Sequence, residues 1–380
     1  MSNKNLIILS IIAVITVTWA AVQPQAIHSK ATRPQRKTFE ESFLIQGLDL
    51  SSVASIQIGT GGDPLTLVRR GIQFVIANKD DYPADTNKIN TLLVNLADLR
   101  VSELVTDNSE NHKSLQVTED NAQNVVKFFD RDGALITGII VGAKAVVEGA
   151  AGMPQTYVRL LSSSNVFAAR QVPTVSTSAL DYVNKELVSI KADEIEKVVV
   201  AHSDSNYTLK AVKNDKEPTY ILDNVPEGKQ LAVNQAKSLF SAFASLTFQD
   251  VQKDTEVAQT LNPAGSVICY LTNQVAYTFD VLEGDEKSYV KVKADYLDST
   301  PIVKENRIES DEELKAKEAK LLARDTADSF TKTHRGWLYE IPEWKVKNLI
   351  KSRDDLLEDI KPTEKPTSDG NAAPESLGTE

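Results

Sequence analysis

Stretches in which apolar and polar side chains alternate occur twice along the chain, far apart in the sequence. Val53, Ile56 and Ile58 are the apolar members of the first stretch, and residues 195–200 repeat the pattern 142 positions later. This alternation is typical of strands that are buried on one face only. Further strands are predicted beside each stretch, at residues 65–68 and 73–76 in the first half and at 207–209 and 220–222 in the second.

A helical pattern follows these strands in each half of the chain. Apolar residues recur at spacings of three and four at Ile89, Leu92, Leu93, Leu96 and Leu99, and again at Ala236, Leu239, Phe240, Phe243 and Leu246. Such spacing places the side chains on one face of a helix. Pro83 lies just ahead of the first helix, as a start signal does.

Matching strands also follow each predicted helix. Residues 126–129 correspond to 268–271 at the same offset of 142, and 157–160 correspond to 289–292. A helix that lies on a sheet buries its own apolar face and the apolar face of the sheet at the same time. We therefore predict an α+β fold with two tandem, diverged copies of a helix-on-antiparallel-sheet unit. Cys269 falls in one of these strands and is expected to be a buried thiol.

The last 80 residues follow a different pattern. A charged helix is predicted over 311–324, a strand over 336–342 and an amphipathic helix over 344–357. Together they form a helix-strand-helix extension in this prediction. Residues 361–380 contain three prolines and mostly polar side chains, which favours disorder.

The run Leu6–Val22 contains 17 residues without a charged side chain. As a helix it would be about 25 Å long, the short end of a bilayer span. One interpretation is an uncleaved signal-anchor, and the other is a signal peptide cleaved near Ala20. We favour the anchor, and thus one transmembrane helix ahead of the two units, because the run exceeds the roughly 7–15 apolar residues of a typical signal peptide.

The charges near the run Leu6–Val22 do not by themselves decide on which side of the membrane the body lies. The first 37 residues carry five basic and no acidic side chains, and most of the basic ones follow the run. A strict positive-inside count would keep the body in the cytoplasm, but large domains translocate largely regardless of nearby charge. A single cysteine also suits an oxidising compartment. We expect a single-pass protein of the bacterial inner membrane with its body in the periplasm.

These patterns predict six consecutive regions. They are a signal-anchor (1–22), a basic linker (23–42), a first α+β unit with its connector (43–190), a second α+β unit (191–300), the C-terminal extension (301–360) and the tail (361–380).

Composition narrows the classes of function. The chain has 380 residues, a net charge of −11, one cysteine and four histidines. An acidic body repels phosphate backbones, so nucleic-acid binding is not expected. One cysteine excludes an intramolecular disulfide framework and a cysteine-rich zinc site, and we predict no metal site.

The order of several segments resembles one bacterial family. The segments are residues 43–58, 82–100, 128–142, 157–160 and 336–357. Together they are similar to an uncharacterised domain-of-unknown-function family with one N-terminal span, often encoded beside gliding-motility-type ABC transporter subunits. The resemblance implies an extracytoplasmic, membrane-anchored accessory protein, and it implies no catalytic residues.

A search for chemistry-bearing motifs finds little. The glycine-rich stretch Gly59–Asp63 lacks the lysine of a phosphate-binding loop and is interpreted as a hairpin turn. Gly138 and Gly142 are likewise interpreted as a turn. His112 and His202 lie in polar stretches and are expected to be solvated, while His334 adjoins the predicted strand at Trp337. There is no nucleophile elbow, and we predict neither catalytic residues nor a cofactor.

We therefore expect a non-enzymatic accessory subunit of an ABC-type transport complex, acting through protein contacts with the permease or another inner-membrane subunit. The alternatives are a substrate-capturing module for a transporter and an envelope enzyme with an unrecognised site. An exposed apolar strip would favour the accessory role, and a deep apolar pocket would favour capture. Trp337, Tyr339 and Trp344 are the candidate partner-facing residues, although strand aromatics usually pack inward.

Overall fold

The computed structural model describes residues 41–145, 154–202, 206–214, 218–255, 260–303 and 309–360. These residues form two compact units. Of the described residues, unit 1 takes those within 41–69 and 89–177, and unit 2 takes those within 70–88 and 178–360. The predicted span Leu6–Val22 and the predicted tail 361–380 lie outside the described residues.

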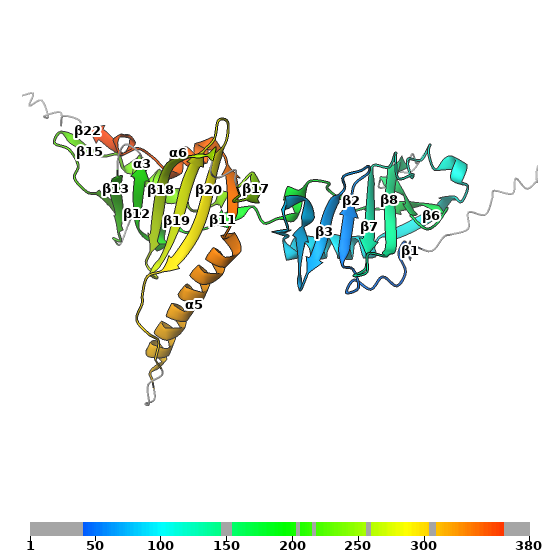
Figure 1. The fold of residues 1–380 in the computed structure, drawn as a ribbon, viewed down its shortest axis with the longest axis horizontal. Coiled ribbons are helices and arrows are strands. Elements are labelled where there is room, and N and C mark those ends of the chain that lie inside the picture. Colours follow the sequence, from blue (N-terminus) through cyan, green and yellow to red (C-terminus); the bar gives the residue numbers. More distant parts are fainter. Residues whose placement is uncertain are drawn as a thin grey trace, which may run out of the picture. The chain divides into compact units, whose positions relative to one another are not determined.

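The first large sheet has ten strands, in the order β1-β6-β10-β9-β8-β7-β2-β3-β4-β5 (Figure 1). Its elements, with helix α2, are β1 (Ser42–Phe43), β2 (Ser55–Ile58), β3 (Leu65–Arg70), β4 (Gln73–Ile76), β5 (Tyr82–Pro83), α2 (Thr86–Ala97), β6 (Arg100–Thr106), β7 (Asn124–Phe129), β8 (Leu135–Ala145), β9 (Gln155–Leu160) and β10 (Val166–Arg170). Residues 70–88, which include β4 and β5, belong by their contacts to unit 2.

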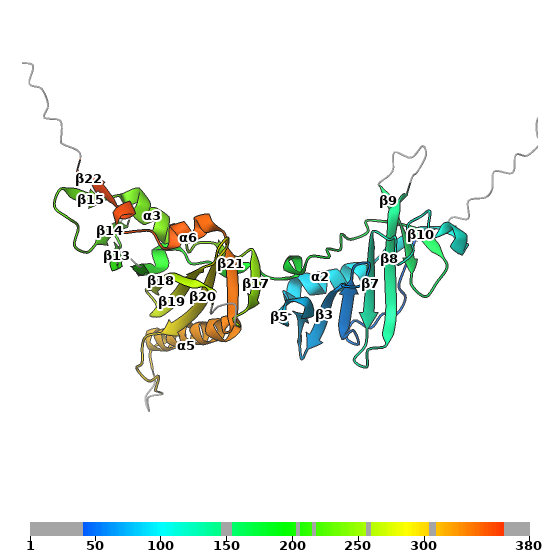
Figure 2. The same cartoon turned by 45° about the horizontal axis from the view of Figure 1, so that its top comes forward.

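The second large sheet has eight strands, in the order β14-β13-β12-β18-β19-β20-β21-β17 (Figure 2). Its strands are β12 (Ile195–His202), β13 (Asn206–Val212), β14 (Thr219–Leu222), β17 (Asp250–Lys253), β18 (Asn262–Leu271), β19 (Val275–Glu283), β20 (Ser288–Tyr296) and β21 (Trp337–Ile341). The helices of this unit are α3 (Val233–Ser241), α5 (Asp311–His334) and α6 (Glu343–Leu349). Two small ladders pair β11 (Glu186–Val188) with β16 (Leu246–Thr247) and β15 (Lys229–Leu231) with β22 (Leu357–Asp359).

The two large sheets share one order of connection. From β4, the first sheet reads β4-β3-β2-β7-β8-β9-β10-β6, and the second reads β14-β13-β12-β18-β19-β20-β21-β17. The alternating stretches form corresponding strands, and Ile56 and Ile58 of β2 are fully buried, as are Val198 and Val200 of β12. Side chains at every second position of a strand share a face, so these residues build the core side of each sheet.

The predicted fold class is wrong. The structure is mostly antiparallel sheet, and within the residues it describes no helix is both long and apolar enough to cross a membrane. Nor do residues 301–360 form an extension, because β21 lies in the second sheet between β20 and β17. This strand joins β17 to the rest of the sheet, since without β21 the backbone groups on one side of both β20 and β17 would lack hydrogen-bond partners.

The two C-terminal helices also differ from prediction. Helix α5 continues ten residues beyond the predicted end, to His334, and Gly336 follows with a φ of +79°. A capping box between Ser310 and Glu313 begins this helix. Helix α6 is shorter than predicted, because the chain leaves helical geometry at Ile350, where φ is −109° and ψ is 46°.

Two glycines predicted to form a turn lie inside strand β8. A Cβ atom at Gly142 would come within 2.5 Å of the Leu115 carbonyl oxygen and 2.6 Å of Val117 Cγ1. The loop around Leu115 therefore crosses the strand too closely for any side chain. Gly59, by contrast, lies in a hairpin turn between β2 and β3, as predicted, and has a φ of +123°.

His112 is buried and not solvated, contrary to prediction. Its Nε2 atom lies 2.9 Å from the Ser164 carbonyl oxygen, so this nitrogen donates and the histidine holds the loop in place. Arg159 supports the same region, because its Nε donates to the Val117 carbonyl at 2.9 Å and its Nη1 to the Ser163 carbonyl at 2.7 Å. His202, also predicted to be a solvated loop residue, is the half-buried last residue of β12.

Candidate functional site

The three aromatic residues predicted to face a partner lie on two consecutive elements of unit 2. Trp337 and Tyr339 belong to β21, and Trp344 belongs to the first turn of α6. Pro342 separates the two elements. It has no N–H to continue the sheet, and its φ of −58° suits the start of a helix.

Trp337 and Tyr339 pack inward. They share a face of the strand, and both contact Tyr82, with ring centroids 4.9 Å and 6.3 Å away from it. Phe248 completes the cluster at 5.1 Å from Tyr339. Tyr339 is fully buried and has no surface to offer a partner, so the partner-facing hypothesis is withdrawn for this residue.

Fully buried Tyr339 and half-buried His334 form a polar pair at this cluster. His334 Nδ1 and the Tyr339 hydroxyl oxygen are 2.6 Å apart. Burial lowers the pKa of His334 to about 4 and raises the pKa of Tyr339. The imidazole of His334 is therefore neutral, and its Nδ1 accepts a hydrogen bond from the Tyr339 hydroxyl. This hydrogen bond satisfies the one polar group of the buried tyrosine side chain.

Trp344 is 62% exposed. Val346, Leu349 and Ile350 are the buried residues of this segment. Successive residues of a helix are about 100° apart, so Trp344 lies roughly 200° from Val346 and points away from the core. The spacing of the three buried residues is visible in the sequence, and it is the signal that separates Trp344 from the other two aromatics.

A hollow of about 260 Å³ lies beside Trp344, between α3 and α6. Its lining residues are Ser238, Ser241, Ala242, Ala244, Ser245, Trp344, Lys345 and Asn348. The serines and alanines come from the end of α3 and the turn that follows it, about a hundred residues before α6. The sequence does not indicate this hollow, because neither segment carries a motif and only the fold brings these residues together.

Lys345 is the charged residue of this hollow. Its ammonium group donates to Thr247 Oγ1 at 2.6 Å and to the Ser245 carbonyl at 3.2 Å. The same group lies 5.4 Å from the centre of the Trp344 ring. Desolvation by burial lowers its pKa. Two of its three N–H donors are therefore used within the protein.

A second hollow, of about 550 Å³, is also lined by residues of α6. Its lining includes His202, Glu283, Glu343, Lys347 and Asp355. Glu343 and Lys347 form an ion pair of 2.7 Å within α6, which lowers the pKa of the glutamate and raises that of the lysine. Both side chains are largely exposed, so this hollow is a solvated, charged surface.

Unit 1 has a hollow of its own, of about 540 Å³. Arg100, Arg170, Glu41 and Asp98 contribute charges of both signs to its lining. Arg170 pairs loosely with Glu41 at 3.7 Å, and the Arg100 guanidinium lies 4.8 Å from the centre of the Phe43 ring. The charges balance, so this hollow does not favour an anion or a cation.

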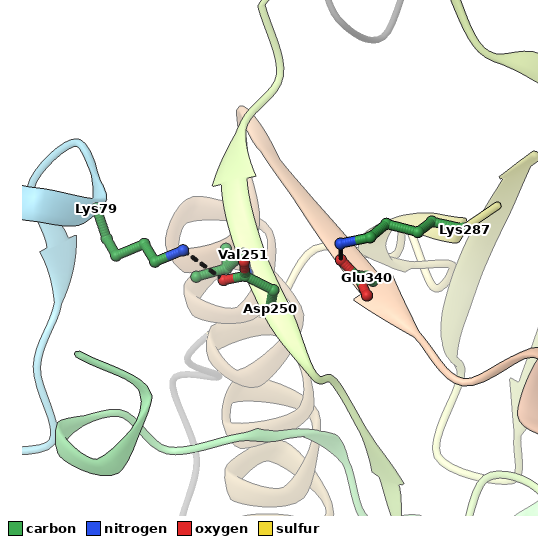
Figure 3. Close-up of polar contacts among 5 residues, drawn as sticks. All are labelled: Lys79, Asp250, Val251, Lys287 and Glu340. Atoms are coloured by element: carbon green, nitrogen blue, oxygen red, sulfur yellow. Dashed lines mark hydrogen bonds and ion pairs between the residues drawn. The ribbon is translucent and has the colours of Figure 1, made fainter. Parts of the chain in front are cut away.

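Two ion pairs flank strands β17 and β21 in unit 2 (Figure 3). Lys79 Nζ lies 2.6 Å from Asp250 Oδ1, which also accepts the backbone N–H of Val251 at 2.7 Å. Lys287 Nζ lies 2.7 Å from Glu340. Asp250 and Glu340 are directly opposite each other on neighbouring strands. The two lysines therefore offset a cross-strand repulsion between carboxylates.

The described residues contain no group of three or more histidine, cysteine, aspartate or glutamate side chains placed to hold a metal ion. Cys269 is fully buried in β18, and desolvation raises its pKa. Such a thiol stays protonated and is a poor nucleophile.

Residues 75–263 match the family model of a domain of unknown function, DUF4340. The match supports the resemblance to an uncharacterised family over this part of the chain, and it does not bear on the predicted N-terminal span or on a gene neighbourhood. No curated protein and no solved structure matches the chain.

Proposed function

We propose that the protein is a non-enzymatic accessory subunit that binds another protein through helix α5. The observation that carries this proposal is a set of exposed leucines on that helix. Leu314, Leu321 and Leu322 are 51%, 54% and 65% exposed. Leucine is among the residues most often found fully buried, so three on one exposed helix favour a protein-binding surface.

The geometry of α5 directs these leucines away from unit 2. Ala323 and Ala327 are the buried residues of this 24-residue helix, and they define the face that packs on the sheet. Leu314 and Leu321 are seven residues apart and lie on the opposite face. In Figure 1 the N-terminal half of α5 continues beyond the ends of β19 and β20.

The helix is held firmly despite its exposure. The Thr331 hydroxyl donates to the Ala294 carbonyl at 2.7 Å and accepts the Ala294 N–H at 2.8 Å. Nearer the N-terminus, Lys320 pairs with Asp298 at 2.7 Å. A partner therefore meets a preformed helix and pays little ordering entropy on binding.

The charges beside the leucines indicate the chemistry of the partner. Asp311, Glu318 and Asp325 follow one another at intervals of seven residues and are all exposed. They form an acidic row on one side of Leu314 and Leu321, whereas Lys317 and Arg324 lie on the other side. A complementary segment would carry apolar side chains with lysine or arginine on the side that meets the acidic row.

The resemblance described above supports an ABC-type permease or another inner-membrane subunit as this partner. It also supports a location on the extracytoplasmic side of the bacterial inner membrane. Protease treatment of spheroplasts tests the location, because an extracytoplasmic body is degraded while the membrane is intact. Survival of the body until the membrane is permeabilised would contradict it.

Site-specific photocrosslinking in native membranes tests the partner. A photoreactive amino acid at Leu321 should yield a crosslinked membrane protein that mass spectrometry identifies as a transporter subunit. Leu135 is the matched control, since it is an exposed leucine of unit 1. Leu321→Glu should weaken copurification of that subunit, whereas Leu135→Glu should not. Identical crosslinks from both positions, with an unaffected transporter, would contradict the accessory role.

A further inference from the structure

We infer that the hollow between α3 and α6 binds an uncharged carbohydrate, with Trp344 as the surface on which one sugar ring stacks. The inference is independent of the proposed function, because it concerns a different surface from the leucines of α5. It replaces the partner-facing role predicted for Trp344.

The hollow offers many hydrogen-bonding groups that the protein does not use. The side chains of Ser238, Ser241, Ser245 and Asn348 make no hydrogen bond within the described part of the chain. Each serine supplies one donor and two lone pairs, and asparagine supplies two donors and an acceptor. A ligand that satisfies them must itself both donate and accept at several points, as a ring bearing hydroxyl groups does.

The charge of the hollow selects against ionic ligands. Its lining contains no carboxylate, and the one ammonium group, on Lys345, already donates to two oxygen atoms of the protein. An anionic ligand would meet only Lys345, whose ammonium group already makes two hydrogen bonds. A cationic ligand would meet no negatively charged side chain. The free groups are all neutral, which suits a neutral ligand.

The indole ring supplies the apolar half of the site. An aromatic ring has a negative face, and the C–H groups on the flat side of a sugar carry a slight positive charge. Lys345 Nζ lies 5.4 Å from the centre of the Trp344 ring, and the side chain is 62% exposed, so part of the ring is open to a ligand. The methyl groups of Ala242 and Ala244 add apolar surface to the lining.

The size of the hollow limits how much ligand is enclosed. At about 260 Å³ it is smaller than the roughly 300–1,000 Å³ of drug-sized sites. It therefore encloses one ring of a longer glycan, and the neighbouring rings extend into solvent. Binding should accordingly depend on the ring at Trp344 more than on the length of the chain.

Calorimetric titration of the full-length protein tests the inference. The probes are the β-1,4-linked tetramers of N-acetylglucosamine and of glucose, and the α-1,4-linked tetramer of glucose. We expect saturable binding of at least one probe. Trp344→Ala should weaken it by about tenfold or more, and Trp344→Phe should keep most of it because the aromatic face remains.

Two controls keep the result interpretable. Leu322→Ala removes an equally exposed apolar side chain on α5 and should leave the affinity unchanged. Trp344 lies at the surface, so its replacement should leave the far-ultraviolet circular dichroism spectrum unaltered. Absence of saturable binding of all three probes, or equal affinity of the wild type and Trp344→Ala, would overturn the inference.

Discussion

The Nδ1 atom of His334, the last residue of α5, lies 2.6 Å from the hydroxyl oxygen of Tyr339 in β21. The contact joins the end of the long helix to the centre of the aromatic cluster. Phe330 stacks beside the imidazole with ring centroids 4.3 Å apart. The surroundings of His334 are therefore apolar, and burial holds its pKa at about 4.

This contact predicts a loss of stability in mild acid. An unfolded histidine takes up its proton near pH 6.5, whereas folded His334 does so only near pH 4. The unfolded state binds more protons between these values, so stability falls as the pH falls through that window. The free energy of unfolding should decrease by at most about 3 kcal/mol because of this histidine. Urea unfolding at pH 7 and pH 4.5 measures it.

The variant His334→Gln isolates this contribution. The glutamine oxygen can accept the Tyr339 hydroxyl proton, but the side chain does not titrate. The difference in unfolding free energy between pH 7 and pH 4.5 should shrink by most of the predicted amount. His202→Gln is the control for removing a histidine. An unchanged difference in His334→Gln would show that another group governs acid stability.

Gly142→Ala should destabilise unit 1. The new methyl group would meet two backbone carbonyl oxygens and a valine side chain, the nearest at 2.5 Å, and backbone cannot yield cheaply. Overpacking of this kind costs about 1–3 kcal/mol. Gly62→Ala is the matched control, because no atom lies within 4 Å of its added Cβ. Equal midpoints of urea unfolding in the two variants would contradict the close crossing at Gly142.

The buried helix leucines should be costly to truncate. Leu92 of α2 and Leu239 of α3 lie in corresponding helices and are both buried. Leu→Ala at either position should reduce the free energy of unfolding by about 2–5 kcal/mol, since it removes apolar contacts and leaves a cavity. Val94→Ala, on the exposed side of α2, should cost about 0.5 kcal/mol or less. If the alanine variants of Leu92 and Leu239 lost no more unfolding free energy than Val94→Ala, the two leucines would not be buried.

The ion pair between Lys79 and Asp250 should make a small, salt-sensitive contribution. The two side chains are 27% and 39% exposed, so solvent screens part of their attraction. A double-mutant cycle with Lys79→Met and Asp250→Asn should give a coupling of about 0.2–1 kcal/mol. The coupling should decrease between 0.05 and about 1 M salt, over which the Debye length falls to about 3 Å. A coupling that salt leaves unchanged would mean that the pair is effectively buried.

Local patterns predicted elements better than they predicted their ends. The alternation at Ile56 and Ile58 and the apolar face of α2 both appear in the structure as buried positions. The end of α5 was missed because nothing in the sequence stops the helix before Gly336, and its last ten residues are stabilised by packing on β20. The turn expected at Gly142 is a strand because a distant loop, not local geometry, requires glycine there.

The sequence by itself determined which residues alternate, which faces of the helices are apolar, and that Cys269 belongs to a core strand. These properties depend on neighbours within a few positions, where geometry is set by the backbone repeat. Only the tertiary structure decided that β21 completes the second sheet, that Tyr339 is buried while Trp344 is exposed, and that Ser241 and Asn348 line one hollow. Those outcomes depend on contacts between segments far apart in the chain, whose pairing is selected by the burial of surface over the whole unit.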